Sequence, residues 1–219
     1  MRSILCLFEG GATGAADGYY RMKRSPASTL LHLGPGLANG LANLHNAKKA
    51  HSGIVNIVGE HAIDHIKLNA PLTSDIEGIA RPVSHWVKTS LSSKDIARDG
   101  AEAIAVAKVA PGQIATLILP GDTAWNEGAN YDEENITNNL NQVSNQKIEI
   151  AAKQLRDAKK PLILVGGSAL EDDNFINIAK IAEKIGCPVM TDWFNARIDK
   201  GQGRINAVRI PYVVEKAVN

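Results

Sequence analysis

Apolar runs of strand length alternate with helical patterns along most of this 219-residue chain, and this alternation limits its fold more than any other feature. The patterns predict strands over residues 3–8, 27–33, 53–59 and 115–120, and helices over 11–24, 37–50 and 93–110. Strands separated by helices form βαβ units, in which parallel strands carry helices on both faces. The sequence therefore predicts an α/β fold with a mostly parallel sheet.

Residues 121–146 interrupt the alternation with a polar, asparagine-rich segment, which we interpret as an interdomain linker. Beyond it, helices are predicted over 147–160 and 174–186, and strands over 161–167 and 187–192. We therefore divide the chain into a first domain (1–120), the linker (121–146) and a second α/β domain (147–219). Two strands are too few for a stable core. The first domain also opens abruptly at a strand, so we expect the sequence to be part of a longer protein.

Composition excludes several kinds of partner. The net charge is +1 and no basic block stands out, so nothing favours nucleic-acid binding. Gly, Pro or charged residues break each apolar run well short of the roughly 20 residues that a membrane helix needs. Cys6 and Cys187 both lie in apolar, strand-like contexts. We interpret them as buried thiols of a cytoplasmic protein.

Polar side chains follow three of the predicted strands. Glu9 comes directly after the first strand and opens a helix, where the helix dipole favours a carboxylate. His32 and His61 fall at the carboxyl ends of the next two strands. A helix-opening acid or a strand-end histidine is usually structural when it occurs alone. Three such residues on the edge where α/β folds bind ligands favour a binding site.

Two glycine-rich turns also follow strands, but neither has a complete nucleotide-binding motif. Gly34-Pro35-Gly36 would let a ligand approach the backbone closely, and the segment 165–168, VGGS, has a similar position. Neither has the GxGxxG or GxxxxGK[ST] spacing. The histidines show no HExxH pair and have no cysteine nearby, so no metal site is predicted.

Taken in order, these residues resemble the pyrimidine-binding domain of thiamine diphosphate enzymes. The matching order is Glu9, then A-DGY-R, then GPG-x-x-N, then a strand and PLTSDIEGIARPVSHWV. The group includes acetolactate synthases, which serve branched-chain amino acid biosynthesis, and benzoylformate decarboxylase. Residues 160–199 resemble the start of the family's central domain. The resemblance therefore covers nearly the whole chain.

The resemblance implies a role for each candidate residue. The family's glutamate at the position of Glu9 hydrogen-bonds N1′ of the aminopyrimidine, and an apolar pocket favours sharing a proton there. Benzoylformate decarboxylase has its catalytic histidine at the position of His32, whereas acetolactate synthases have a glutamine near the cofactor at that of His61. The implied cofactor-binding residues are Glu9, Gly34, Pro35, Gly36, Asn39 and His61, and the implied catalytic residues are Glu9 and His32.

Three functions remain open at this stage. The first is part of an acetolactate synthase, which decarboxylates pyruvate and condenses the product with a second 2-oxo acid. The second, favoured by His32, is a benzoylformate decarboxylase-like enzyme. The third is a non-catalytic α/β binding or regulatory module. The resemblance implies a homodimer or homotetramer, thiamine diphosphate, and Mg²⁺ bound through a GDG…N motif that this sequence lacks. We therefore expect the chain alone to be inactive, and FAD binding stays open.

Overall fold

The computed structural model describes residues 2–129, 142–201 and 204–212. The chain divides into two compact units, Met1–Asn138 (unit 1) and Asn139–Asn219 (unit 2). No helix among the described residues is long and apolar enough to cross a membrane.

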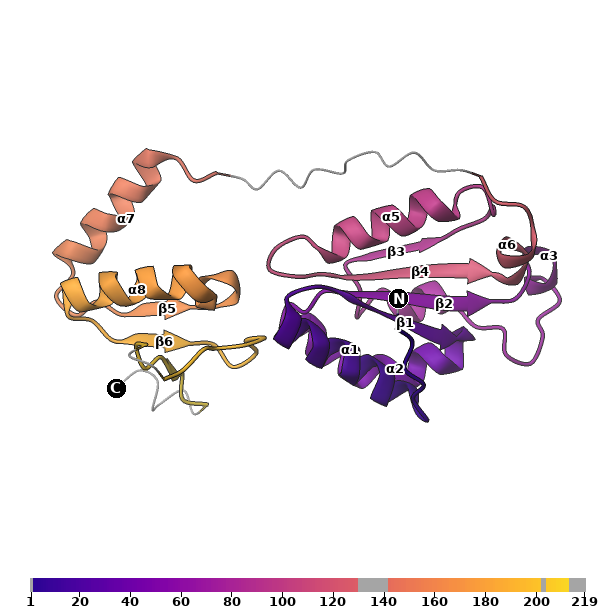
Figure 1. Cartoon of the computed structure of the whole chain (residues 1–219), viewed down its shortest axis with the longest axis horizontal. Coiled ribbons are helices and arrows are strands. Elements are labelled where there is room, and N and C mark those ends of the chain that lie inside the picture. Colours follow the sequence, from indigo (N-terminus) through magenta and orange to yellow (C-terminus); the bar gives the residue numbers. More distant parts are fainter. Residues whose placement is uncertain (1, 130–141, 202–203, 213–219) are drawn as a thin grey trace. The chain divides into compact units, whose positions relative to one another are not determined.

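Unit 1 is a four-stranded parallel sheet with helices on both faces, which confirms the predicted fold class (Figure 1). The strands are β1 (Ala27–His32), β2 (Ile54–Glu60), β3 (Trp86–Thr89) and β4 (Ile114–Pro120), in the order β1-β2-β4-β3. The helices are α1 (Glu9–Lys23), α2 (Leu33–Lys49), α3 (Ile63–Ile66), α4 (Ile76–Ala80), α5 (Ile96–Ala107) and α6 (Gly121–Trp125).

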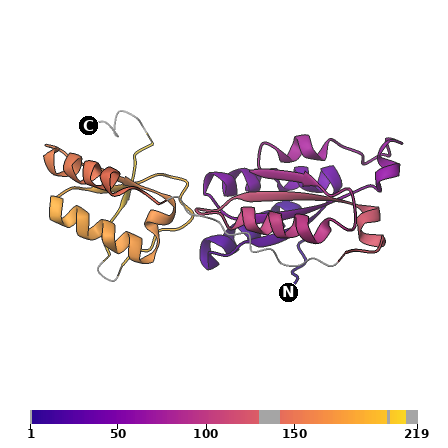
Figure 2. The ribbon, with the colours of Figure 1, turned by 90° about the horizontal axis from the view of Figure 1, so that it is seen from above.

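Helices cover both faces of this sheet (Figures 1 and 2), and each face has its own apolar core. On one face, Leu31 and its register partner Val58 pack with Leu37 and Leu44 of α2. On the other face, an alanine-lined surface of α5 packs on β2 and β4. β2 and β4 are buried on both sides, and their sequences are therefore mostly apolar, whereas β1, at the edge, alternates between buried and exposed residues.

A buried row of polar side chains crosses three strands of the sheet. Thr29 Oγ1 of β1 donates to Asn56 Oδ1 of β2 at 2.8 Å, and Asn56 Nδ2 donates to Thr116 Oγ1 of β4 at 3.1 Å. Ser84 Oγ lies 2.7 Å from Thr116 Oγ1. Thr29, Asn56 and Thr116 are also register partners along the strands. Because buried polar groups need their partners, this row favours one register of the sheet.

The DGYYR motif of α1 binds the loops that enter β2 and β4. Asp17 accepts hydrogen bonds from Arg21 and from Ser52 Oγ, and Tyr20 donates its hydroxyl to Pro111 O at 2.5 Å. Ser52 and Pro111 precede their strands, so these contacts lie at the amino edge of the sheet. The motif is therefore structural and lies at the end opposite the candidate site.

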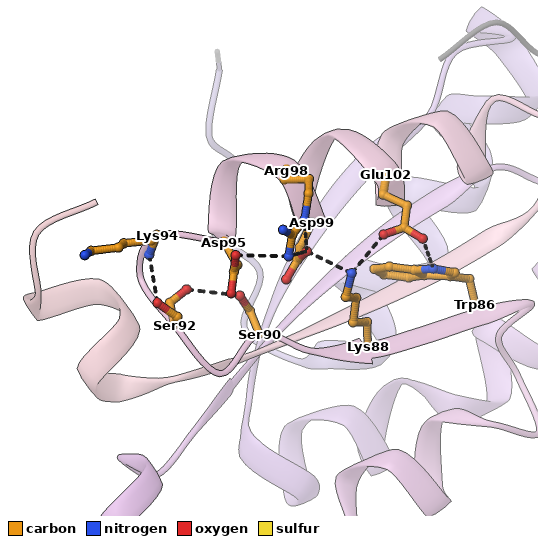
Figure 3. Close-up of polar contacts among 9 residues, drawn as sticks. All are labelled: Trp86, Lys88, Ser90, Ser92, Lys94, Asp95, Arg98, Asp99 and Glu102. Carbon is orange, nitrogen blue, oxygen red and sulfur yellow. Dashed lines mark hydrogen bonds and ion pairs between the residues drawn. The ribbon is translucent and has the colours of Figure 1, made fainter. Parts of the chain in front are cut away.

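An ionic cluster joins α5 to the edge strand β3 (Figure 3). Lys88 Nζ lies 2.9 Å from Asp99 Oδ1 and 3.0 Å from Glu102 Oε2, and Arg98 approaches Asp99 at 3.2 Å. Burial by itself would raise the pKa of Asp99, but hydrogen bonds from Lys88 and Ser90 and the charge of Lys88 outweigh it and lower that pKa. Its hydrogen bonds to Asp99 and Glu102 raise the pKa of Lys88.

The first predicted strand is wrong. Residues 3–8 form no strand and bend at Leu7 and Phe8, and Ile4, Leu5 and Leu7 are 74%, 91% and 101% exposed. Cys6 is accordingly half-buried, whereas Cys187 is buried as predicted. An apolar run needs a neighbouring strand to become a strand itself, and the described residues supply none here.

Unit 2 is a smaller parallel sheet with order β5-β6-β7. Its elements are α7 (Asn145–Asp157), β5 (Ile163–Val165), the 3-10 turn η1 (Gly167–Leu170), α8 (Asp172–Ile185), β6 (Val189–Thr191) and β7 (Val208–Arg209). Phe175 and Leu170 lie in its apolar core. The expected count of two strands is wrong, since β7 adds a third from a tail without a recognisable pattern. The predicted linker includes helix α6 at its start, and its residues 130–141 lie outside the described part.

Candidate functional site at the carboxyl edge of β1 and β2

Glu9 is the first residue of α1 and lies half-buried against α2. Asn39 of α2 donates a hydrogen bond from Nδ2 to Glu9 Oε2 at 3.2 Å. The two residues are 30 positions apart in sequence, and both belong to the predicted cofactor-binding set. The structure therefore brings these two candidates together and gives the carboxylate a defined direction.

The first half of α1 and the middle of α2 approach closely enough for side chains of one helix to donate hydrogen bonds to the backbone of the other. Thr13 Oγ1 of α1 donates to Gly40 O at 3.2 Å, and Asn43 Nδ2 of α2 donates to Gly10 O at 2.6 Å. A Cβ at Gly40 would lie 2.8 Å from Thr13 Cγ2, so only glycine allows this approach. These contacts between α1 and α2 fix the start of α1 and therefore the position of Glu9.

The chain turns sharply from β1 into α2. His32 ends β1 and precedes the helix, and Leu33 has a φ of 55°, a left-handed value that is uncommon for leucine. Gly34-Pro35-Gly36 is thus the first turn of a helix, and the expected loop at this point is wrong. Proline fits there because the first turn needs no backbone donor. A Cβ at Gly34 would clash with the side chain of Ser74, so the loop before α4 packs directly on this turn.

Gly36 lies between the two predicted catalytic residues. A Cβ at Gly36 would stand 3.7 Å from Glu9 Oε1 and 3.5 Å from the Cβ of His32. Because glycine has no side chain, the space above it is bounded by the Glu9 carboxylate and the start of the His32 side chain. Gly36 itself is buried, whereas His32, Pro35 and Asn39 are exposed. The carboxylate of Glu9, a hydrogen-bond acceptor, and the imidazole of His32 therefore lie on either side of Gly36, which carries no side chain.

His61 lies one residue past the end of β2. Its ring is tilted against that of His65, with centroids 5.4 Å apart. Its Nε2 is buried and has no hydrogen-bond partner among the described residues. β2 is the direct neighbour of β1, with His32 in register with Gly59. His61 is thus at the same edge, but it has no described contact with Glu9 or His32.

Thr13 and Asn43 hold α1 against α2 and so position Glu9, although neither residue is singled out by the sequence alone. The available signal was the spacing of glycines: Gly10 and Gly14 in α1, and Gly36 and Gly40 in α2, are each four residues apart. Such spacing places small residues on one helix face and lets a second helix approach closely.

Comparison with known proteins relates two stretches of the chain to known families. Residues 1–81 match the family described as thiamine pyrophosphate enzyme, N-terminal TPP binding domain. Residues 116–200 match a second family, CO dehydrogenase beta subunit/acetyl-CoA synthase epsilon subunit. The amino-terminal part of the chain is therefore similar to the thiamine pyrophosphate enzymes.

Within that class it is similar to acetolactate synthase large subunits. IlvX of Mycobacterium tuberculosis is named as a candidate acetolactate synthase large subunit. It is 41% identical to this chain over 99% of the chain and 42% of its own length. Benzoylformate decarboxylase of Pseudomonas aeruginosa is 29% identical over 85% of the chain and 36% of its own length. The chain therefore spans well under half of these relatives.

A solved structure supports the fold. The thiamine diphosphate-dependent 4-hydroxybenzoylformate decarboxylase of Rhodococcus jostii superposes with a TM-score of 0.76 and 24% sequence identity. The match covers 86% of this chain and 37% of that protein.

Proposed function

We propose that this chain provides the pyrimidine-binding half of a thiamine diphosphate site that acts on 2-oxo acids, most like that of an acetolactate synthase large subunit. Unit 1 is the pyrimidine-binding domain in this proposal, and residues 147–219 belong to the central domain. The observation that carries it is the carboxylate of Glu9, which Asn39 orients beside the side-chain-free Gly36.

The donor and acceptor set fits an aminopyrimidine ring. One oxygen of Glu9 accepts from Asn39, and the other lies toward Gly36, where the backbone carries no side chain. A carboxylate in that position can accept a hydrogen bond from a protonated ring nitrogen, and the glycine backbone leaves room for a flat ring. Glu9, Gly34, Pro35, Gly36, Asn39 and His61 would line the ring.

Bound thiamine diphosphate supplies the carbon nucleophile and the electron sink for decarboxylating a 2-oxo acid. Glu9 would hold and return one proton at the ring nitrogen. His32 is exposed at the same edge, and an imidazole there can exchange a proton with a substrate oxygen near neutral pH. The diphosphate and Mg²⁺ would be bound by a domain that the described residues do not include, in a homodimer or homotetramer.

The test pairs this chain with a polypeptide that carries a diphosphate-binding domain and measures CO₂ release from pyruvate and from benzoylformate. Glu9→Gln is expected to lower turnover at least about 100-fold, since it removes the proton-holding group. The control is Glu149→Gln on the exposed face of α7, which should leave turnover unchanged. Equal turnover of Glu9→Gln and the unchanged chain would show a non-catalytic module instead.

Product analysis separates the two enzymatic alternatives. Acetolactate from pyruvate supports the synthase. Aldehyde as the only product, together with loss of activity in His32→Ala, supports the benzoylformate decarboxylase-like alternative, which the position of His32 favours. Visible absorbance of the purified protein tests whether it also binds FAD.

A further inference from the structure

His85 directly precedes β3 and forms two hydrogen bonds with Ile114, the first residue of β4. Its backbone N–H donates to Ile114 O at 2.8 Å, and its ring nitrogen Nδ1 accepts from the backbone N–H of Ile114 at 2.9 Å. The two residues thus continue the pairing of β3 with β4 by one position toward the amino edge of the sheet. At this position a side chain replaces the backbone acceptor of a regular sheet.

The bond to Nδ1 requires a neutral ring. A backbone N–H can only donate, so Nδ1 must carry a lone pair and the ring proton must lie on Nε2. Protonation would place a second N–H at Nδ1, opposite that of Ile114, and the bond would be lost. Ile114 is 0% exposed, so water does not replace the lost acceptor unless the backbone opens there.

The surroundings of His85 disfavour a positive charge on its ring. Lys48 of α2 donates from Nζ to Pro82 O at 2.9 Å and to Ser84 O at 3.1 Å, which holds its ammonium group beside the turn that leads to His85. Partial burial is the main cause that lowers the pKa of His85, and the positive charges of Lys48 and His51 lower it further. β4, on the other side, has no ionisable side chain.

Solvent can nevertheless reach the ring, because His85 is exposed. The two residues before it are not: Val83 lies in the apolar core, and the hydroxyl of Ser84 lies 2.7 Å from Thr116 Oγ1. His85 is therefore the place at which a proton from solvent can act on the buried N–H of Ile114.

We propose that His85 is a pH-sensitive contact that holds the start of β3 to β4 at neutral pH and releases it in acid. The neutral ring completes the bonding of Ile114, and the imidazolium form opens the amino end of the β3–β4 pair. The opening stays local. Ile76 of α4 remains in the apolar core, and Glu77 accepts a hydrogen bond from Thr89 Oγ1 at 2.8 Å near the other end of β3.

The direction of the pH dependence follows from the linkage between protonation and folding. A histidine whose pKa is lowered in the folded chain favours folding in its neutral form. The contribution of His85 is therefore complete above the ordinary histidine pKa of about 6.5 and is lost as pH falls below it toward the lower folded value.

Nuclear magnetic resonance of the full chain tests the proposal. The ring nitrogen shifts of His85 should show the proton on Nε2 at pH 7.5 and a titration midpoint below about 6.5. The protection of the Ile114 amide against hydrogen exchange, corrected for the intrinsic rate, should fall at least about tenfold from pH 7.5 to pH 5. Ile54 is the internal reference, because its N–H donates to Gln113 O at 3.1 Å and depends on no histidine. Its protection should stay the same.

Three variants identify the group that responds. His85→Asn keeps an acceptor at the position of Nδ1 but cannot titrate, so the protection of Ile114 should be equal at the two pH values. Lys48→Gln removes a nearby positive charge and should move the midpoint of His85 upward. His45→Asn is the matched control, since His45 is exposed on α2 and its Nδ1 lies 3.3 Å from Asn46 Oδ1. It should leave the pH response of Ile114 unchanged.

A neutral ring with its proton on Nδ1, or a midpoint at or above that of an ordinary histidine, would overturn the proposal. So would an equal loss of protection at Ile114 and Ile54, which would show that the whole sheet opens. An unchanged pH response in His85→Asn would also overturn it, because another group would then cause the response. The tautomer and the comparison of the two amides are measured in the unchanged chain, so they do not depend on the folding of any variant.

Discussion

The amide of Asn39 and the carboxylate of Glu9 share a hydrogen bond of 3.2 Å, although they belong to different helices. This bond gives one oxygen of Glu9 a fixed partner and leaves the other toward Gly36. The relationship can be tested in the chain alone, without any cofactor, because it depends on charge.

Asn39→Asp replaces the donor by a second carboxylate opposite Glu9. Two like charges near a surface repel each other, so the variant should be less stable at pH 7 than at pH 4 by about 1 kcal/mol relative to the unchanged chain. Asn39→Ala removes an exposed hydrogen bond and should cost less than about 1 kcal/mol at either pH. Urea unfolding at the two pH values measures both.

The double variant Glu9→Gln/Asn39→Asp should remove the pH dependence, since one of the two charges is gone. If the double variant keeps the full pH dependence, the repulsion comes from another group and the Glu9–Asn39 contact is absent in solution.

Gly40→Ala should separate α1 from α2. Its Cβ would lie 2.8 Å from Thr13 Cγ2, and neither helix backbone can move freely because Thr13 and Asn43 bind both. Overpacking of this kind costs about 1–3 kcal/mol, which chemical unfolding would show. Gly18→Ala in α1 is the matched control, since nothing stands within 4 Å of a Cβ there, and it should stabilise the chain slightly.

Thr13→Ser in the Gly40→Ala background removes Cγ2 and keeps the hydroxyl. It should recover part of the lost stability. No recovery would mean that the cost arises from something other than the contact between these two side chains.

The alternation of patterns predicted the sheet of unit 1 well, because β2 and β4 are buried on both faces and α5 has one apolar side. The carboxyl edge as the place of His32 and His61 followed from the same alternation, whereas Glu9 was assigned to that edge through a strand that does not form. The strand over residues 3–8 failed for the opposite reason. A strand forms only where a neighbouring strand can hydrogen-bond to it. A run such as SILCLF shows that its side chains are mostly apolar, but not that such a neighbour exists.

The short strands β3 and β7 escaped prediction because they are four and two residues long and lack a regular apolar pattern. The close contact of α1 with α2 was likewise hidden. Glycines spaced by four permit an approach, but the partner of each helix appears only in three dimensions. Asn43 and Thr13 look like ordinary helix residues in the sequence.

Asn56→Leu should destabilise unit 1 by about 2–3 kcal/mol. The variant removes the link between Thr29 and Thr116 and leaves the buried hydroxyl of Thr29 without its partner, whereas Thr116 keeps its contact with Ser84. Adding Thr29→Val should recover part of the loss, because that hydroxyl is then gone too. Chemical unfolding measures all of these variants.

Asn46→Leu is the matched control for the buried row. Asn46 is exposed near the end of α2, and its side chain meets only the exposed ring of His45, at 3.3 Å, among the hydrogen bonds described. Losing that contact should change the free energy of unfolding by less than about 0.5 kcal/mol. An equal effect of Asn46→Leu and Asn56→Leu would contradict a special role for the buried row.

The ionic cluster in Figure 3 predicts a dependence of stability on pH. The pKa of Asp99 is lowered in the folded chain, since the hydrogen bonds from Lys88 and Ser90 outweigh the opposing effect of burial. A lowered pKa means that folding favours the charged form. The stabilisation is therefore complete above the ordinary aspartate pKa of about 4 and is lost as pH falls through the lower folded value.

Asp99→Asn should accordingly cost about 2 kcal/mol at pH 7, where it leaves Lys88 and Arg98 without their shared carboxylate. The difference from the unchanged chain should shrink as pH falls below 4, and urea unfolding across pH 2–7 measures it. Asp64→Asn is the matched control: its carboxylate also faces a lysine, Lys67, but the Asp64 side chain is 99% exposed. Exposed pairs contribute little, so this variant should stay within about 0.5 kcal/mol at every pH. If both variants lose the same stability, or if the Asp99→Asn difference does not narrow in acid, the charge on Asp99 does not hold α5 against β3.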